Sequence, residues 1–167
     1  MTNFLHMDFV KPMRVIVISG YFNPIHSGHI DYIKSAKQRG DVLVVIVNND
    51  NQVELKGSVP FQNENERFKI VNNIKGVDRT VLSIDEDSTV CESLRMVYKT
   101  YEDDPFFHQM FFCNGGDRGS DNTPETDKYG QDPRVQFEFG IGGDDKMNSS
   151  SWILKGYFER QRKLLGI

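Results

Sequence analysis

The feature that most constrains this chain is an apolar run that leads through a histidine-containing turn into a helix and then into a second apolar run. Residues 14–19 are mostly β-branched and end at Gly20, which predicts a strand buried on both faces of a sheet. Residues 27–39 carry apolar side chains at helical spacing and end at Gly40, and residues 42–47 form the second apolar run. A strand, a helix and a strand within about 35 residues predict a right-handed βαβ unit with two parallel strands.

The alternation of apolar runs and helical patterns continues along the chain. The further elements that we expect are a helix over 63–74, a strand over 79–84, a helix over 90–101, and strands over 108–113 and 135–139. This alternation predicts an α/β fold with a doubly wound parallel sheet, a Rossmann-like architecture. We expect a single domain over residues 1–167, with an N-terminal extension over 1–12, a long loop over 114–134 and a C-terminal helix over 149–167.

Composition and charge exclude several classes of function. The formal net charge of −4 lacks the excess of Lys and Arg that binding to a nucleic-acid backbone requires. No apolar run approaches the ~20 residues of a membrane helix, and residues 1–11 lack the apolar centre of a signal peptide. Cys91 and Cys113 lack the spacing of a zinc or redox motif, so we expect them to pack in the core. We therefore expect a cytoplasmic protein with no nucleic-acid partner and no membrane partner.

His26 and His29, two of the four histidines, lie three residues apart where the first strand leads into the first helix. Ligands of doubly wound sheets bind at the carboxyl ends of the strands, and the first turn of a helix offers unpaired N–H groups to an anion. Gly28 between the two histidines lets a ligand approach the backbone closely. A zinc site is the less favoured alternative, because a third ligand would have to come from elsewhere and no HExxH motif is present.

The stretch "GYFNPIHSGH" resembles the HxGH signature of the cytidylyltransferase-like nucleotidyltransferase superfamily. Three further segments resemble elements of that superfamily in the same order, namely "LKGSVPFQNENERFKIV", "NGGDR" and "NSSSWILK". The resemblance implies that His26, His29 and Lys56 are catalytic, that Arg67 is a structural or phosphate-facing partner, and that the fold is the Rossmann-like nucleotidyltransferase fold. The nucleotide-binding residues that it implies are Gly20, Tyr21, Phe22, Asn23, Gly28, Arg67, Asn114, Gly115, Gly116, Asp117, Lys146, Ser149, Ser150 and Ser151.

The implied reaction transfers a nucleoside monophosphate from CTP or ATP to a small phosphorylated acceptor and releases pyrophosphate. Features of two branches are present, since "FNPIH" leans toward adenylyltransferases of the nicotinate and pantetheine type and the "KG…ER" pattern toward cytidylyltransferases and heptose-phosphate adenylyltransferases. We favour CMP as the transferred group and keep AMP as the alternative. Asn23 stands where many members have Asp, and Lys146 stands near the place of an arginine found in many cytidylyltransferases.

The resemblance also implies Mg²⁺, which we expect the substrate phosphates to hold with no side-chain ligand. We expect the acceptor to contact the polar loop over 115–133, and we allow for a homodimer. One alternative from another class is a nucleotide-binding regulatory protein without turnover, although groups aimed at a leaving pyrophosphate favour an enzyme. A fragment of a class I aminoacyl-tRNA synthetase shares a similar histidine motif, but this chain is too short and too acidic for it.

Overall fold

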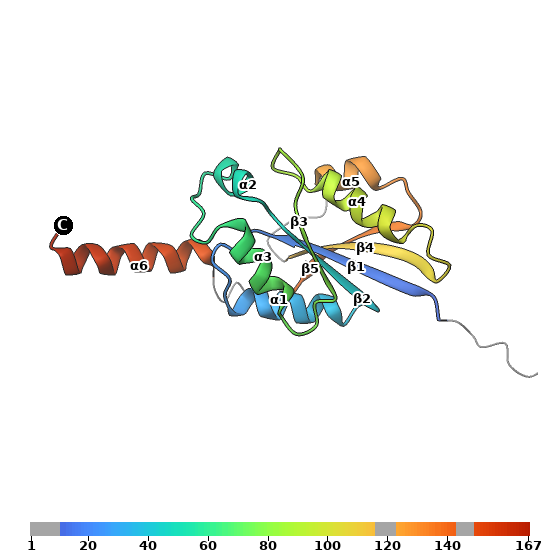
Figure 1. Cartoon of the computed structure of the whole chain (residues 1–167), viewed down its shortest axis with the longest axis horizontal. Helices are drawn as coiled ribbons and strands as arrows, with labels where there is room; N and C mark the ends of the chain where they lie inside the picture. Colours follow the sequence, from blue (N-terminus) through green and yellow to red (C-terminus); the bar gives the residue numbers. More distant parts are fainter. Residues whose placement is uncertain (1–10, 116–122, 143–148) are drawn as a thin grey trace, which may run out of the picture.

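A computed structural model describes residues 11–115, 123–142 and 149–167. The strands are β1 (Met13–Gly20), β2 (Val42–Val47), β3 (Arg79–Leu82), β4 (Phe107–Gly115) and β5 (Val135–Ile141). The helices are α1 (Ser27–Lys37), α2 (Asp50–Leu55), α3 (Glu64–Asn72), α4 (Cys91–Tyr101), α5 (Pro124–Tyr129) and α6 (Ser150–Leu165). The strands form one parallel sheet in the order β3-β2-β1-β4-β5, which confirms the predicted α/β architecture (Figure 1).

Helices cover both faces of the sheet, as a parallel sheet requires. Alternate residues of β1 point to opposite faces, so that Ile16 and Ile18 pack toward α1 and α3 while Val15 and Val17 pack toward α4. All four of these side chains are fully buried. The β-branched run that opened the sequence analysis is therefore the centre of the core, and it holds the carboxyl end of β1 in a fixed place.

The switch point of strand order lies at β1, which pairs with β2 on one side and with β4 on the other. In open α/β sheets, this is where a crevice forms at the carboxyl ends of the strands. The turn that leaves β1 at Gly20 and the end of β4 at Gly115 therefore meet at the same edge of the sheet. The histidine motif lies in that turn.

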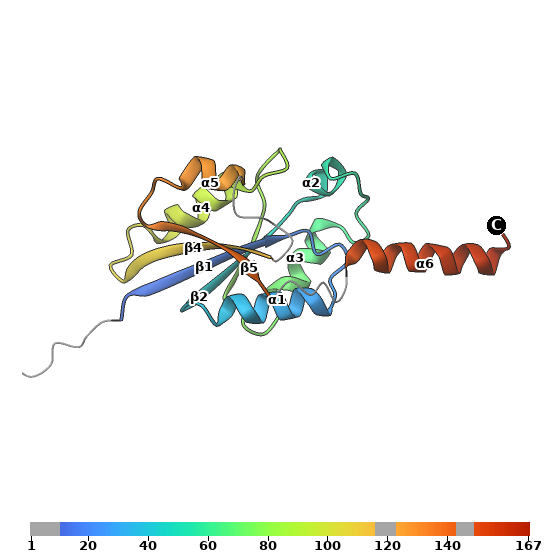
Figure 2. The same ribbon diagram turned by 180° about the vertical axis from the view of Figure 1, so that it is seen from behind.

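Helix α6 projects away from the rest of the molecule (Figures 1 and 2). Its 16 residues include no buried side chain. In the described ranges, no helix is both long and apolar enough to cross a lipid bilayer.

Two short helices depart from the predictions. Helix α5 lies within residues 114–134, which we predicted to be a long loop, so that prediction is wrong for residues 124–129. The carboxylate of Glu125 is buried and accepts a hydrogen bond from the N–H of Val90 at the start of α4, at 2.9 Å. The hydroxyl of Tyr129 donates to the carbonyl of Cys91, also at the start of α4, at 3.0 Å. Helix α2 was not predicted, and it follows β2 after only two residues.

Candidate active site

The exit from β1 is formed by Gly20 and Phe22. A Cβ atom at Gly20 would lie 2.8 Å from Cζ of Phe22, so the glycine leaves room for the aromatic ring. Phe22 has a positive φ of 50° and is 1% exposed. Its ring lies edge-on to the imidazole of His29, with 4.9 Å between centroids. Phe22, which we predicted to bind nucleotide, is therefore a buried residue that packs against the ring of His29.

The two motif histidines stack on each other at the first turn of α1, with ring centroids 3.8 Å apart and an interplanar angle of 28°. His26 occupies the N-cap position of α1, and its backbone N–H donates to Nδ1 of His29 at 3.2 Å. A Cβ at Gly28 would lie 3.1 Å from atoms of the His26 ring. The absence of a side chain at Gly28 therefore leaves room for the His26 ring, a role that we did not predict.

The protonation state of His29 follows from its surroundings. Burial, and then the electrostatic influence of the neighbouring His26 and Lys56, lower the pKa of His29 from 6.5 to about 3. The ring is consequently neutral at physiological pH. Because Nδ1 accepts the backbone N–H of His26, the ring proton is carried by Nε2. His29 thus offers one fixed N–H donor at the crevice, and this donor does not depend on pH between about 5 and 8.

Lys56 lies at the same place, although it comes 27 positions after His29 in the sequence. It is the C-cap residue of α2, and its Nζ lies 4.2 Å from the ring centroid of Tyr21. Its charge contributes to the lowered pKa of His29, which shows that the two side chains are close. The structure therefore brings together the three residues that the sequence predicted to be catalytic.

Asn23 connects the motif to the loop that follows Lys56. Its side chain is 5% exposed, donates to the carbonyl of Val59 at 2.9 Å, and accepts from the N–H of Phe61 at 2.6 Å. All of these contacts are to backbone groups of one loop. We predicted that Asn23 binds nucleotide, and the structure shows that its amide also positions the loop that follows Lys56.

Arg67 is buried beneath the same turn, with an exposed fraction of 1%. Its guanidinium donates to the carbonyls of Tyr21 at 2.7 Å, Asn48 at 2.6 Å and Gln62 at 3.0 Å, and to the carboxylate of Asp50 at 2.6 Å. These four contacts satisfy the planar group from three segments of the chain. Of the two roles that we predicted for Arg67, the structure supports the structural one, and the residue has no exposed surface with which to reach a phosphate.

Asn114 and Gly115 end β4 on the other side of β1. Asn114 is 3% exposed, and its Nδ2 group has no hydrogen-bond partner among the described residues. A buried amide donor without an acceptor is rare in a native structure, and it often marks a place where a ligand or water binds. Gly115 lies against Tyr32, whose hydroxyl donates to the carbonyl of Cys113 at 2.6 Å. This end of β4 therefore presents a polar donor at the switch point.

The serines at the start of α6 reach the same turn. Ser149 is the N-cap residue, and its Oγ accepts from the N–H of Trp152 at 3.2 Å. The hydroxyl of Ser150 donates to the carbonyl of Pro24 at 2.8 Å, and Oγ of Ser151 lies 3.0 Å from Oγ of Ser149. The N-terminus of α6 is thus attached to the motif loop, as the predicted phosphate-binding role requires. Gly116, Asp117 and Lys146, which were also predicted to bind nucleotide, lie outside the described residues.

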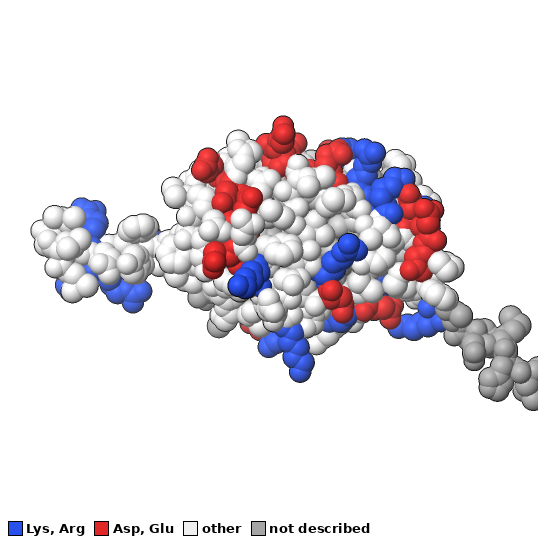
Figure 3. All heavy atoms as spheres, in the orientation of Figure 1, with Lys and Arg blue, Asp and Glu red and all other residues white. Residues whose placement is uncertain are grey.

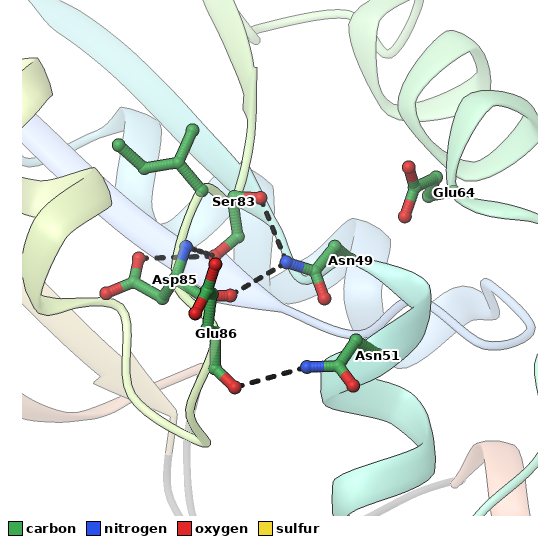
Figure 4. A pocket seen from close by; sticks show the side chains of 7 residues that line it. Asn49, Asn51, Glu64, Ser83, Asp85 and Glu86 are labelled. Atoms are coloured by element: carbon green, nitrogen blue, oxygen red, sulfur yellow. Dashed lines mark hydrogen bonds between the residues drawn. The ribbon is translucent and has the colours of Figure 1, made fainter.

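A hollow of about 630 Å³ opens at the carboxyl ends of β2 and β3 (Figure 4). Two asparagine side chains on one wall bond to the backbone of the facing loop: Asn49 donates to the carbonyls of Ser83 and Asp85, and Asn51 donates to that of Glu86. Glu64, on the opposite wall, accepts from the N–H of Asp50 at 2.8 Å. The lining residues are Asn49, Asn51, Glu64, Ser83, Ile84, Asp85 and Glu86.

The sequence analysis missed the polar residues that follow β2. Asn48 is buried and bonds to Gln52, and its carbonyl accepts from Arg67, while Asp50 pairs with the Arg67 guanidinium. A signal for them existed in the sequence, because "NNDNQ" comes directly after an apolar parallel strand, where polar side chains gather at the ligand-binding edge of a sheet.

Nothing in the described part of the chain groups three or more His, Cys, Asp or Glu side chains in a way that could hold a metal ion. The histidine pair itself stacks ring on ring at 3.8 Å, which does not point two nitrogens at one ion. The arrangement at the end of β1 consists of donors and a cation, which suits an anionic ligand.

Comparisons with known proteins place this geometry in context. The cytidylyltransferase-like family model matches residues 17–127. A protein named FAD synthase from Thermoplasma acidophilum is 32% identical over 146 residues, which cover 86% of this chain and 94% of that protein. A protein named ethanolamine-phosphate cytidylyltransferase from Dictyostelium discoideum is 40% identical over 68 residues, which cover 41% of this chain and 19% of that protein. The crystal structure of a lipopolysaccharide core biosynthesis protein from Thermoplasma volcanium is 26% identical, with a TM-score of 0.61 over 80% of this chain and 99% of that chain.

Proposed function

Since the chain belongs to the cytidylyltransferase-like family and is a nucleotidyltransferase, we propose that it transfers AMP from ATP to a small phosphorylated acceptor, with FMN as the first candidate, and releases pyrophosphate. FAD consists of FMN joined through its phosphate to AMP, so a nucleotidyl transfer that makes FAD uses ATP as donor and FMN as acceptor. The relative named FAD synthase is matched over almost its whole length. This match moves our proposal from CMP, which the sequence motifs favoured, to AMP.

The observation that carries the proposal is the convergence of His26, His29 and Lys56 at the carboxyl end of β1. A phosphate monoester has a second pKa of about 6 and is largely ionised at neutral pH, so the attacking oxygen needs no strong general base. Catalysis then depends on positioning and on stabilising the charge that develops on the phosphate oxygens. The neutral His29 donates from Nε2 and Lys56 supplies positive charge, which are the groups that such a reaction requires.

The same reasoning assigns roles to the surrounding residues. We propose that Asn114 donates its Nδ2 group to the nucleotide, because this donor is buried at the switch point and lacks an acceptor among the described residues. We propose that the hydroxyl of Ser151 and the N-terminus of α6 bind the phosphates, and the bond from Ser150 to the motif loop at Pro24 supports this. Asn23 and Arg67 act as positioning residues that hold Lys56 and Tyr21 in place.

We propose that Mg²⁺ enters with the triphosphate and is held mainly by phosphate oxygens. The described residues contain no cluster of three or more potential metal ligands. When bound, the ion would neutralise part of the charge on the leaving pyrophosphate. Lys56 and His29 would supply the remaining stabilisation from the protein side.

We propose that the acceptor binds in the hollow at the ends of β2 and β3. This replaces our expectation of a site at residues 115–133, because α5, which lies within those residues, packs against α4. A hollow of about 630 Å³ lies within the range of about 300–1,000 Å³ that is usual for small-ligand sites. Its amide and carbonyl groups suit a polar ring system, whereas the carboxylates of Glu64 and Glu86 would repel a second phosphate.

Transfer of CMP is the second candidate. It is favoured by the relative named ethanolamine-phosphate cytidylyltransferase, although only 19% of that protein is matched. The two candidates differ in both substrates, so they are separated by one assay.

The purified chain should be incubated with Mg²⁺ and each pairing of ATP, CTP, GTP or UTP with FMN, phosphoethanolamine or a sugar phosphate, and pyrophosphate should be measured together with the nucleotidyl product by chromatography. We expect pyrophosphate and FAD from ATP with FMN. A product formed only from CTP would establish the second candidate. Absence of pyrophosphate with every pair would contradict both.

A further inference from the structure

Helix α6 has an apolar stripe that nothing in the described part of the chain covers. At 100° per residue, six of its seven large apolar side chains fall within about 140° of the helix circumference, and Trp152 lies outside this arc. Several of them are strongly exposed, with values of 61% for Phe158, 79% for Leu164 and 69% for Leu165. The members of this apolar stripe are Ile153, Leu154, Tyr157, Phe158, Leu164 and Leu165. A solvated stripe of this size on a projecting helix indicates a surface for another molecule.

The opposite side of α6 is basic. It carries Lys155, Arg160, Arg162 and Lys163 against a single acidic residue, Glu159. This excess contrasts with the formal net charge of −4 of the whole chain. The helix and the remainder of the molecule therefore have opposite charge.

A second exposed apolar surface lies beside the base of α6. Leu55, Val59 and Phe61, which we call the apolar loop, are 55%, 76% and 58% exposed. The side chain of Asn23 bonds to the backbone of this loop, and the carbonyl of the next residue, Pro24, accepts from Ser150 at the start of α6. The apolar loop and the base of α6 are thus attached to two consecutive residues of the motif turn.

We propose that α6 pairs with the α6 of a second copy of this chain in antiparallel orientation, and that the C-terminal end of each helix packs on the apolar loop of the other copy. A repeat of four residues along the stripe, three of them apolar, supports this pairing. Leu154, Tyr157, Gln161 and Leu164 are separated by three and four residues, which is the seam of a helix pair. In an antiparallel pair, Leu154 lies opposite the partner's Leu164 and Tyr157 opposite the partner's Gln161.

The length of the helix fits this arrangement. Sixteen residues at 1.5 Å per residue give about 24 Å. With Leu154 opposite the partner's Leu164, the partner's Ile167 reaches the base of α6, where the apolar loop lies. Ile167 is itself 74% exposed. A strip of about 24 Å by 10 Å alone is smaller than the ~800 Å² per partner of a standard interface, so the apolar loop supplies area that the helix pair lacks.

The charge distribution favours a second copy of the chain, rather than an anionic membrane, as the molecule that covers the apolar stripe. Acidic side chains gather on the surface of the molecule that flanks the base of α6 (Figure 3). Helices α2 and α3, which lie on the side of the molecule toward α6 in Figure 1, carry Glu54, Glu64 and Glu66. These carboxylates attract the basic C-terminal half of the partner's helix, whereas they would oppose a negatively charged bilayer.

Sedimentation equilibrium of the full chain tests the proposal. We expect the wild type to have twice the 19.2 kDa of one chain at micromolar concentration. Phe158→Glu places a carboxylate in the stripe and should give a monomer. Gly156→Glu adds the same charge on the other side of α6 and should remain a dimer. Because α6 has no buried side chain, neither change should affect the fold of the monomer. A monomeric wild type, or equal masses for the two variants, would overturn the proposal.

Disulfide trapping tests the orientation of the pair. A mixture of Leu154→Cys and Leu164→Cys chains should form a mixed disulfide-linked dimer on mild oxidation, and Leu154→Cys alone should not. Efficient linkage of Leu154→Cys to itself would show a parallel pair and overturn the antiparallel one. Co-sedimentation of the wild type with vesicles of anionic phospholipid, lost in Phe158→Glu, would instead assign the stripe to a membrane surface.

Discussion

Phe22 and Arg67, which support the turn after β1, are each 1% exposed, whereas α6, which begins against the same turn, has no buried residue. The first region is held by contacts from several segments of the chain, including four hydrogen bonds from one guanidinium. The second region is held at its base by the bond from Ser150 to Pro24. The difference indicates that the residues of the histidine site are positioned by contacts within one chain, whereas the exposed stripe of α6 is available to contact a second chain.

The largest effect is expected at Arg67. Arg67→Met leaves the carboxylate of Asp50 and the carbonyls of Tyr21 and Asn48 without their donor, so the free energy of unfolding should fall by about 3–5 kcal/mol. Urea denaturation measures this loss. Arg162→Met on α6 is the matched control and should change stability by less than about 0.5 kcal/mol. Equal losses in the two variants would remove the contrast between the regions.

The pH dependence of stability sharpens the account of the histidine pair. The pKa of His29 is lowered from 6.5 to about 3 in the folded chain, so below pH 6.5 the unfolded chain binds a proton that the folded chain does not. Stability should therefore decrease as the pH falls from about 7 toward 3, by about 2 kcal/mol between pH 7 and pH 5 from this residue. Urea denaturation at both pH values, compared with His29→Asn, isolates this contribution. If the variant lost as much stability as the wild type, His29 would not be the neutral, buried donor that we describe.

A smaller effect is expected at Lys56, which is exposed and contributes to binding more than to folding. Lys56→Ala should raise the KM for the nucleotide by about tenfold, the scale of one lost charge-assisted contact, and should leave the melting temperature nearly unchanged. Initial rates at varied ATP concentration measure it. Lys69→Ala, on the exposed side of α3, is the control and should behave as the wild type. A KM unchanged by Lys56→Ala would place this lysine outside the nucleotide site.

The smallest effect is expected on α6 itself, measured in the monomeric Phe158→Glu background. Leu164→Ser should change the stability of the monomer by less than about 0.5 kcal/mol because the side chain is 79% exposed. Ile33→Val in α1 removes a single methylene from a fully buried side chain and should cost about 0.5–1.5 kcal/mol. A larger loss for Leu164→Ser would mean that α6 packs on its own chain.

The sheet could be predicted from the sequence because its strands are apolar runs with clear ends. Residues 15–18 and 43–47 are buried on both faces in the structure, and the predicted helix over 63–74 is observed as α3. Helices α2 and α5 could not be predicted, since each has six residues and no apolar stripe. Glu125 of α5 is bonded to Val90, and the cap of α2 at Asn49 is bonded to Ser83 and Asp85, so distant residues fix both helices.

The site could be located from the sequence more readily than its roles could be assigned. The histidine pair and Lys56 come together as predicted, because the motif follows a strand whose place in the sheet was clear. Asn23 was predicted to bind nucleotide and Arg67 to be a structural or phosphate-facing partner. In the structure, Asn23 bonds to the backbone of a neighbouring loop, and Arg67 bonds to three backbone carbonyls and to Asp50. Such roles depend on which carbonyls the fold brings within reach, and no local pattern encodes this.

Turnover by His29→Asn tests the central claim most directly, namely that the neutral His29 at the end of β1 serves the transfer reaction. Pyrophosphate release should be measured at saturating substrates for the wild type, for His29→Asn and for His108→Asn, which changes an exposed histidine of β4. We predict a loss of about 100-fold or more in kcat for His29→Asn, the scale of one preorganised donor, with normal turnover in His108→Asn and a folded chain in both. Wild-type kcat in a folded His29→Asn chain would contradict the account.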